Sequence, residues 1–142
     1  MKGFSLIELM IVVVIMGLLA GVLVPKIMDR PDDARVTKAR MDIRTLKSAL
    51  RFYKLDNGMY PTTKQGLLAL IKKPDSRPWP TDWRHGGYLD ASEIPKDPWG
   101  NEYIYRSPGA KQRDYEVICF GSDGKRGGSS YATDLYSWNV QK

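Results

Sequence analysis

The hydrophobic pattern divides the chain near Pro25. Residues 4–24 read FSLIELMIVVVIMGLLAGVLV, and Glu8 is the one charged residue in that run. A helix of about 21 residues spans the roughly 30 Å hydrocarbon core of a bilayer, because each residue adds about 1.5 Å. A secretory signal peptide has a shorter apolar core and a small-residue cleavage site after it, whereas Pro25 and Lys26 follow this run. The pattern therefore predicts a retained membrane-spanning helix.

A helical period resumes after Pro25. The apolar residues that recur at spacings of three and four are Val36, Ala39, Ile43, Leu46, Leu50 and Tyr53. Basic residues lie between them, which is typical of a helix with one buried face. Proline removes one backbone hydrogen bond and kinks a helix without necessarily ending it. We therefore predict one continuous helix over residues 4–54, about 75 Å long, with an apolar first half and an amphipathic second half.

A second, shorter helix is predicted after residue 62. Thr63 is of a residue type preferred as an N-cap, and Pro74 ends the apolar pattern. The apolar face between them consists of Leu67, Leu68 and Ile71. Residues 75–87 are rich in proline, tryptophan, glycine and charge, so we predict a loop there.

Two strands and an edge strand are predicted in the last third of the chain. Residues 102–106 (EYIYR) and 115–120 (YEVICF) are aromatic or β-branched, and 107–109 (SPG) supplies the hairpin connection. Residues 97–101 (DPWGN) have the composition of a turn. After a glycine-rich loop, residues 135–140 are predicted to return as an edge strand. The expected fold class is α+β, with the long helix packed on a small antiparallel sheet.

Composition and charge restrict the alternatives. The chain has 142 residues, which suits one domain, and a formal net charge of +6. Residues 26–54 contain nine Lys or Arg and four Asp. Such an excess fits nucleic acid or anionic lipid, but a solvated helix surface explains it more simply. The four tryptophans, which in principle suit base stacking, lie beside turn residues and not alternately along one strand, so packing in loops and core is favoured.

Enzymatic and transition-metal chemistry find little support. Cys119 is the single cysteine, so no intrachain disulfide can form. His85 and Cys119 together fall short of the four ligands of a tetrahedral zinc site. The chain contains no P-loop, GxGxxG or GxSxG motif. We expect a protein that is not an enzyme.

Glu8 is the most informative residue. A carboxylate inside an apolar membrane helix costs about 2.5 to 3.5 kcal/mol on insertion scales, so it needs a partner, a function, or a position near enough to the interface to reach water. A free amine near Phe4 would suit it, and cleavage after Gly3 would create one.

The N-terminal motif Lys2-Gly3 followed by residues 4–8 (FSLIE) resembles the prepilins that a dedicated membrane peptidase processes. The resemblance implies a leader over residues 1–3, a transmembrane and filament-core helix over 4–25, and a periplasmic pilin-like domain over 26–142. It also implies cleavage after Gly3, N-methylation of Phe4, and pairing of Glu8 with the amine of a neighbouring subunit. The body would then lie outside the cytoplasm, although a plain count of flanking basic residues places it inside.

Later motifs resemble the major pseudopilin family of the type II secretion system, in order along nearly the whole chain. They are residues 53–57 (YKLDN), 60–63 (YPTT), 65–67 (QGL), 97–101 (DPWGN), 121–124 (GSDG) and 138–139 (WN). The implied function is a structural subunit of a periplasmic filament that drives folded proteins across the outer membrane. Implied partners are further copies of the chain, minor pseudopilins, the inner-membrane assembly platform and the prepilin peptidase, with no nucleic acid.

Two alternatives stay open. One is a type IV pilus subunit that acts in adhesion, motility or DNA uptake, against which the single cysteine and the residues 121–128 (GSDGKRGG) argue. The other is a membrane-anchored periplasmic binding module that never polymerises.

The resemblance also implies a calcium site in the C-terminal loop. Calcium takes about six to eight oxygen ligands, and the matched positions are the carbonyls of Phe120 and Ser122 and the carboxylates of Asp123 and Asp134. Many relatives have two acidic residues before the last strand, where this chain has Thr133 and then Asp134. We therefore expect calcium, bound more weakly than in those relatives.

A second departure lies on the long helix. Relatives often have acidic residues where this chain has Lys47 and Arg51. If contacts between subunits persist at these positions, their partners would be acidic residues of the adjoining subunit, for which Asp75, Asp82 and Asp90 are candidates. A solvated surface explains the two basic residues equally well.

Overall fold

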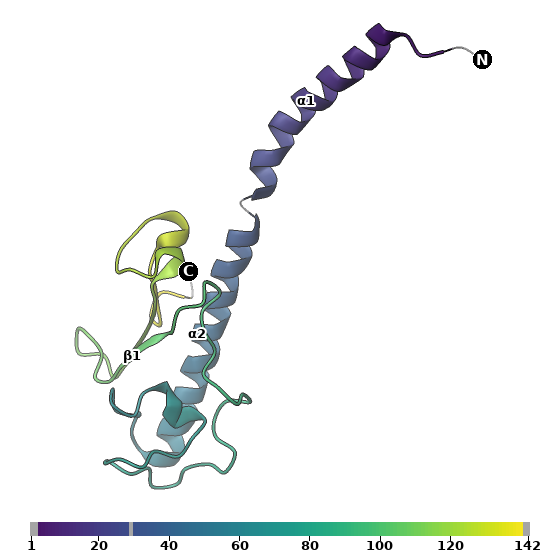
Figure 1. The fold of residues 1–142 in the computed structure, drawn as a ribbon. Coiled ribbons are helices and arrows are strands. Elements are labelled where there is room, and N and C mark those ends of the chain that lie inside the picture. Colours follow the sequence, from purple (N-terminus) through teal and green to yellow (C-terminus); the bar gives the residue numbers. More distant parts are fainter. Residues whose placement is uncertain (1–2, 29, 141–142) are drawn as a thin grey trace. The chain divides into compact units, whose positions relative to one another are not determined.

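The computed structural model describes residues 3–28 and 30–140, with the side chains of residues 21–30 left out. The chain divides into two compact units, Met1–Ala34 and Arg35–Lys142. Helix α1 (Leu6–Met28) is followed by helix α2 (Arg30–Asn57), as Figure 1 shows. The predicted continuity of one helix across residue 29 lies outside the described residues.

Helix α1 is apolar on every side over residues 9–20, the part beyond Glu8 whose side chains the structure describes. It continues through Pro25 to Met28, which confirms that this proline does not end the helix. Its apolar side chains are exposed in the single chain, from 46% at Val12 to 78% at Leu6. Over the side chains that the structure describes, no helix has the length and hydropathy required to cross a membrane. The end of the predicted membrane span, residues 21–24, lies outside that set of side chains.

Helix α2 has the amphipathic pattern that its sequence predicts. The residues at spacings of three and four form one buried face and are at most 3% exposed: Ala39, Ile43, Leu46, Ala49, Leu50 and Tyr53. The helix ends at Asn57, whose side chain donates to the Tyr53 carbonyl at 2.9 Å. Gly58 follows with a φ of 76°, the left-handed conformation that commonly ends helices. Each large side chain on this face contributes about 1.5 to 3 kcal/mol by leaving water.

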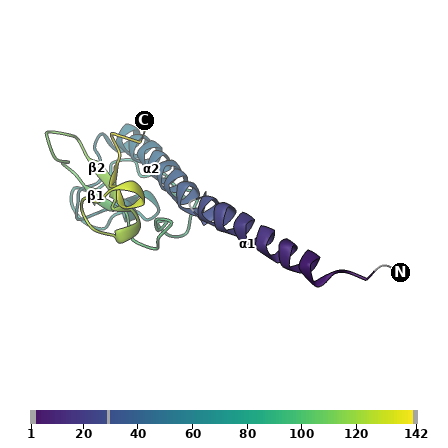
Figure 2. The same cartoon turned by 90° about the horizontal axis from the view of Figure 1, so that it is seen from above.

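The sheet has three short antiparallel strands in the order β1 (Ile104–Arg106), β2 (Glu116–Cys119) and β3 (Leu135–Tyr136). In the second unit, β1 and β2 lie beside α2 (Figure 2). Val117 and Cys119 of β2 are fully buried in the same core as the α2 face. This arrangement confirms the predicted α+β class.

All three predicted strands are shorter than their patterns indicate, and the one expected over 115–120 spans Glu116–Cys119. The strand expected over 102–106 begins at Ile104, because Glu102 forms only an isolated bridge with Lys96. The edge strand expected over 135–140 ends at Tyr136. Asn139 closes a turn there, since its backbone N–H donates to the Tyr136 carbonyl and its side-chain oxygen accepts from the Tyr136 N–H.

The short helix after residue 62 differs from its prediction. It is a 3₁₀ helix, η1 (Leu67–Leu70), and Thr63 is not its N-cap. Thr62 and Gln65 bond reciprocally in the preceding turn, each backbone N–H donating to the other's side-chain oxygen at 3.0 and 3.2 Å. The Thr63 hydroxyl is used elsewhere, because it bonds both backbone groups of Ser107.

The predicted loop and turn are confirmed. Residues 75–87 contain no helix or strand. In the 97–101 turn, Asp97 Oδ1 accepts hydrogen bonds from the backbone N–H groups of Trp99 and Asn101 at 3.0 and 2.8 Å. Asp97 Oδ2 accepts a bond from the buried Cys119 thiol at 3.4 Å. This carboxylate therefore ties the turn to β2.

The tryptophans divide into two groups. Trp83 and Trp99 pack against the core, and Trp83 Nε1 donates to the Ala69 carbonyl at 2.9 Å. Trp79 and Trp138 are 57% and 40% exposed but also make packing contacts, since Arg77 lies over the Trp79 ring and Trp138 stacks on Tyr136.

Candidate functional site

The N-terminal residues singled out by sequence lie together at the start of α1. Phe4 precedes the helix and is 83% exposed. Glu8 lies in the first turn, where its backbone N–H donates to the Ser5 carbonyl at 3.0 Å. A carboxylate in this position interacts favourably with the partial positive charge of a helix N-terminus. Cleavage after Gly3 and methylation of Phe4 stay predictions.

The C-terminal loop folds into two short 3₁₀ helices that pack together, η2 (Gly121–Asp123) and η3 (Ser130–Ala132). Gly121 has a φ of 68°, and a Cβ atom there would lie 2.8 Å from the Tyr131 carbonyl oxygen. Only glycine permits this approach. The packing brings η2 close to the residues just before β3.

Asp134 is the one predicted calcium ligand that is buried, with 7% exposure. Its Oδ2 accepts hydrogen bonds from the Gly127 N–H at 3.0 Å and from the Tyr136 hydroxyl at 2.8 Å. This bond from the hydroxyl to Asp134, followed by burial, raises the pKa of Tyr136. The Asp134 Oδ1 atom is buried without a hydrogen-bond partner among the described residues. A buried carboxylate oxygen in that state is costly unless a cation or water satisfies it.

The other three predicted ligands lie at η2. Phe120 directly precedes it, and Ser122 and Asp123 are within it. Asp123 is exposed, and its Oδ1 accepts a bond from the Lys125 N–H at 3.0 Å. Within the described residues, no three His, Cys, Asp or Glu side chains form a metal-binding group. A cation here would therefore depend on carbonyl oxygens and water, which is acceptable for calcium because it takes neutral oxygen ligands. The unsatisfied Oδ1 of Asp134 fits such an ion.

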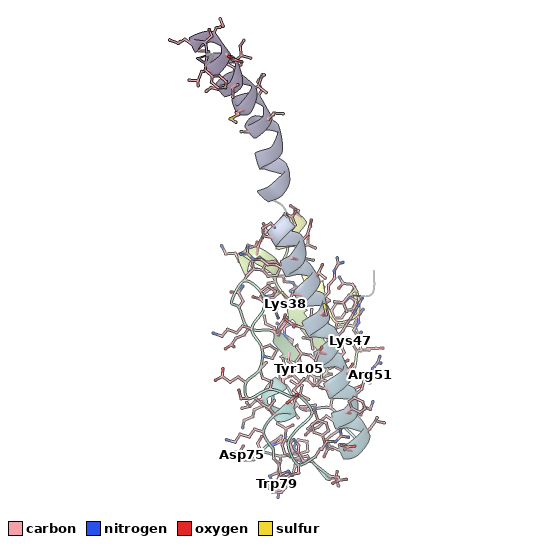
Figure 3. All side chains as sticks on the ribbon, turned by 90° about the vertical axis from the view of Figure 1, so that its right-hand side faces the viewer. Lys38, Lys47, Arg51, Asp75, Trp79 and Tyr105 are labelled. Carbon is pink, nitrogen blue, oxygen red and sulfur yellow. The ribbon has the colours of Figure 1, made fainter. Side chains whose placement is uncertain are left out.

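The two basic helix residues remain on the surface side of α2. Arg51 is exposed and Lys47 is partly buried. Burial, with the charges of Arg51 and Arg44 adding to it, holds the pKa of Lys47 below its usual range. Figure 3 shows Lys47 and Arg51 away from Asp75. The pairing predicted between subunits stays a prediction.

A row of apolar side chains occupies the opposite side of α2 from the core. Its members, here called the outer row, are Met41, Phe52 and Leu55, with exposures of 60, 49 and 76%. Their spacing keeps them on one face of the helix, so the row is a candidate contact surface.

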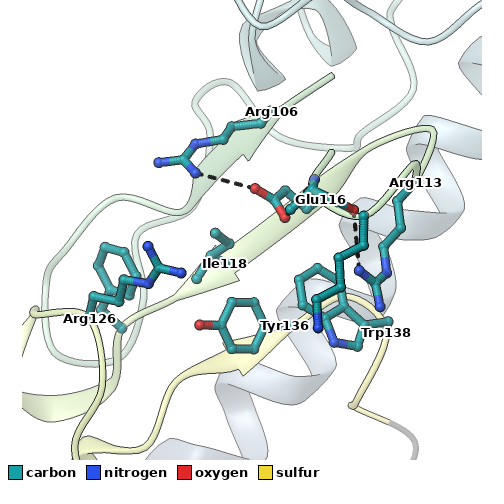
Figure 4. A pocket seen from close by; sticks show the side chains of 10 residues that line it. Arg106, Arg113, Glu116, Ile118, Arg126, Tyr136 and Trp138 are labelled. Atoms are coloured by element: carbon teal, nitrogen blue, oxygen red, sulfur yellow. Dashed lines mark hydrogen bonds and ion pairs between the residues drawn. The ribbon is translucent and has the colours of Figure 1, made fainter. Parts of the chain in front are cut away.

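Sequence reasoning missed a pocket of about 300 Å³ on the outer face of the sheet (Figure 4). Glu116 lies in its wall and is only 2% exposed. The Glu116 Oε1 atom pairs with Arg106 Nη1 at 3.4 Å, and Oε2 accepts a bond from the Ala110 N–H at 3.3 Å. The alternation of Glu116 and Ile118 along β2, continued by Phe120 just after it, is the signal that indicates this second face.

Comparisons with known proteins agree over almost the whole chain. The family model "Type II secretion system (T2SS), protein G" matches residues 26–138, and that of the prokaryotic N-terminal methylation motif matches residues 1–24. The type II secretion system core protein G of Pseudomonas aeruginosa is 50% identical over 138 residues, which cover 97% of this chain and 95% of that protein. The protein of the same name from Vibrio cholerae is 48% identical over 139 residues, covering 98% and 92%.

A solved structure is also similar. It is the crystal structure of the major pseudopilin from the type 2 secretion system of enterohaemorrhagic Escherichia coli. The match has a TM-score of 0.66 and 36% sequence identity, and it covers 81% of this chain and 94% of that one.

Proposed function

The chain belongs to the type II secretion system protein G family, and we propose that it is the structural subunit that polymerises into the periplasmic pseudopilus of such a system. The filament would drive the export of folded proteins across the outer membrane. The observation that carries the proposal is the apolar surface of α1 over residues 9–20, whose side chains are exposed in the single chain. The role is structural and not catalytic.

Burial of α1 in the filament core keeps the apolar side chains of an extracted subunit out of water, so an assembled subunit is far more stable than one exposed to the periplasm. Each Å² of apolar surface removed from water contributes about 25 cal/mol, and α1 exposes large side chains on every face. In the membrane, lipid covers these side chains. In the filament, neighbouring α1 helices cover them.

Glu8 sets the register of subunits. Cleavage after Gly3 leaves a free amine on Phe4, and the Glu8 carboxylate of one subunit pairs with the Phe4 amine of its neighbour. Since a charge of either sign is costly in the apolar filament core, the pair forms only where the two groups meet. Other axial positions leave both charges unpaired and are disfavoured.

Before assembly, the subunit is anchored in the inner membrane. Residues 1–3 form the leader that the prepilin peptidase removes, residues 4–25 form the membrane anchor, and residues 26–142 form the periplasmic domain. The inner-membrane assembly platform and the minor pseudopilins are its partners. The N-terminal methylation motif over residues 1–24 supports this placement against the plain count of basic residues.

Calcium is the proposed structural cofactor of the C-terminal loop. The carbonyls of Phe120 and Ser122 and the carboxylates of Asp123 and Asp134 would hold it. A hard divalent cation there neutralises the buried carboxylate and links the two ends of the loop. The unpartnered Oδ1 atom of Asp134 supports this assignment.

A Glu8→Ala variant tests the filament role. The experiment compares pseudopilus yield and protein secretion in cells that make the wild-type chain, Glu8→Ala, or the control Glu93→Ala, which removes an exposed carboxylate from the periplasmic domain. We expect filament yield to collapse for Glu8→Ala alone, with the protein still present in the membrane. Normal filaments and secretion from Glu8→Ala would contradict the proposal and favour a binding module that does not polymerise. The type IV pilus alternative would be favoured if cells with the wild-type chain carried long surface pili and if Glu8→Ala abolished these pili without reducing protein secretion.

A further inference from the structure

The pocket on the outer face of the sheet is built from five segments: the three strands, the 107–115 connection and the C-terminal loop. Strand register places Arg106 opposite Glu116, and Ile118 between Ile104 and Tyr136. The 107–115 connection contributes Lys111 and Arg113, and the C-terminal loop contributes Arg126. Because the core uses Val117 and Cys119 on the other face of β2, the side chains in this pocket have no role in holding the sheet to α2.

The pocket carries an excess of positive charge. Four basic side chains line it, and Glu116 is the one acidic side chain among the lining residues. Arg106 is paired with Glu116. Over the described residues, Lys111, Arg113 and Arg126 form no ion pair with a carboxylate. An anion that enters the pocket therefore meets three unpaired cations.

The basic side chains are held in place. Arg113 lies over the Trp138 ring with its Cζ atom 4.0 Å from the ring centroid, and its Nη1 donates to the Ala110 carbonyl at 3.2 Å. Figure 4 shows the Arg126 guanidinium and the Tyr136 hydroxyl pointing toward each other. Lys111 and Gln112 both have left-handed backbones, with φ of 54° and 59°. Both values are those of a type I′ hairpin turn, which the bond from the Arg113 N–H to the Ala110 carbonyl at 3.3 Å closes.

The floor of the pocket is apolar and aromatic. Ile118, Phe120, Tyr136 and Trp138 line it. A free phosphate or a headgroup alone would leave these side chains uncovered. Trp138 stacks on Tyr136 with ring centroids 4.5 Å apart and has Arg113 over its ring. Tyr136 and Arg113 therefore already pack against Trp138, which disfavours the base stacking on that ring that single-stranded nucleic acid requires.

We propose that this pocket docks an acidic segment of a partner protein, with carboxylates on Arg113 and Arg126 and an apolar or aromatic side chain between Ile118 and Trp138. Charge complementarity of this kind selects the partner and speeds the encounter, while the buried apolar contact provides most of the affinity. The volume of about 300 Å³ is at the small end for a binding pocket and accommodates one or two side chains, not a whole domain. The proposal does not depend on filament assembly.

Peptide binding to the full chain in nonionic detergent micelles tests the proposal. The probe is a rhodamine-labelled peptide of alternating aspartate and phenylalanine, followed by fluorescence anisotropy. Arg126→Glu is expected to weaken binding by about tenfold or more, and its matched control is Lys125→Glu, an exposed neighbour that does not line the pocket. Trp138→Ala is expected to weaken binding, whereas Trp79→Ala, at an exposed tryptophan outside the pocket, is expected to leave it unchanged.

A variant that binds the acidic peptide more tightly than the wild type distinguishes docking in the pocket from an effect of damage to the fold. Glu116→Gln removes the one negative charge of the pocket and keeps an amide of similar shape, so the acidic peptide should bind more tightly. A variant that merely destabilises the sheet cannot produce this result. A thermal melt of each variant identifies any that fail to fold.

Four outcomes would overturn the proposal. The first is equal weakening by Arg126→Glu and Lys125→Glu, which indicates attraction to overall charge. The second is that a peptide of alternating aspartate and alanine binds as tightly as the aspartate and phenylalanine peptide, and that inorganic phosphate or glycerol phosphate displaces both peptides. This result indicates a site for small anions. The third is tighter binding of a single-stranded oligonucleotide than of the peptide. The fourth is no binding of the peptide at millimolar concentration.

Discussion

The Tyr136 hydroxyl donates to Asp134 Oδ2 at 2.8 Å, while the other carboxylate oxygen of Asp134 is buried and has no hydrogen-bond partner in the described part of the chain. Asp134 is also bonded by the Gly127 N–H, so one side chain connects the glycine-rich loop to the last strand. Asp134 therefore holds both the glycine-rich loop, through Gly127, and the wall of the neighbouring pocket, through Tyr136. A cation or a water at Asp134 Oδ1 would satisfy this buried oxygen and add to the bonds that hold the loop.

Calcium is expected to raise the melting temperature of the full chain in nonionic detergent. A ligand that binds only the folded state stabilises it by about 2.7 kcal/mol when present at 100 times its dissociation constant. Melts followed by circular dichroism, in calcium and in chelator, measure the difference. Asp134→Asn and Asp123→Ala are expected to abolish the calcium-dependent rise.

Asp114→Asn is the matched control for the calcium experiment. Asp114 is exposed and pairs with Lys54, outside the proposed ligand set. Its substitution should leave the calcium-dependent rise intact. If millimolar calcium does not change the wild-type melting temperature, calcium does not bind this loop.

Stability is expected to fall steeply as pH rises above about 10, the ordinary tyrosine pKa. Burial raises the pKa of Tyr103 and Tyr105, and that of Tyr115 to about 12. The unfolded chain therefore loses these protons at a lower pH than the folded chain. The stabilisation is complete below pH ~10 and is lost as pH rises through the folded pKa values. Urea denaturation at a series of alkaline pH values measures the slope.

Tyr105→Phe separates this effect from general alkaline damage. The variant loses the hydrogen bond from the Tyr105 hydroxyl to the Pro61 carbonyl and so is less stable near neutral pH. Its free energy of unfolding should nevertheless depend less on pH above about 10. Phe52→Tyr adds a tyrosine at a half-exposed position and should leave the wild-type slope unchanged. If the free energy of unfolding of Tyr105→Phe falls with pH as steeply as that of the wild type, ionisation of Tyr105 does not cause the alkaline loss of stability.

The two faces of α2 are expected to respond differently to the same substitution. Leu50 is fully buried, and Leu50→Ala should lower the free energy of unfolding by about 2 to 5 kcal/mol. Leu55, in the outer row, is 76% exposed, and Leu55→Ala should change it by less than about 0.5 kcal/mol. We expect Leu55→Ala to reduce pseudopilus yield if the outer row contacts a neighbouring subunit. If Leu55→Ala forms filaments in full yield, the outer row does not contact a neighbouring subunit in the filament.

The buried face of α2 was predictable from sequence, because a helix is a local structure with a fixed period. Spacings of three and four identify Ile43, Leu46 and Leu50 without knowledge of what covers them. The 97–101 turn was predictable for the same reason, since Asp97 bonds backbone groups only two and four residues away. The N-terminal motif with Glu8 is likewise contained in a few consecutive residues.

The remaining features depend on contacts between distant residues. Thr63 was predicted as a cap, but Ser107, 44 residues further along, takes up its hydroxyl. The last strand stops at Tyr136 because Asn139 folds back on it. The pocket exists only because strand register places Arg106 beside Glu116 and because a separate loop brings in Arg126. Local periodicity decides helices and turns, whereas the partner of a polar group and the lining of a pocket are decided by chain segments that meet only after folding.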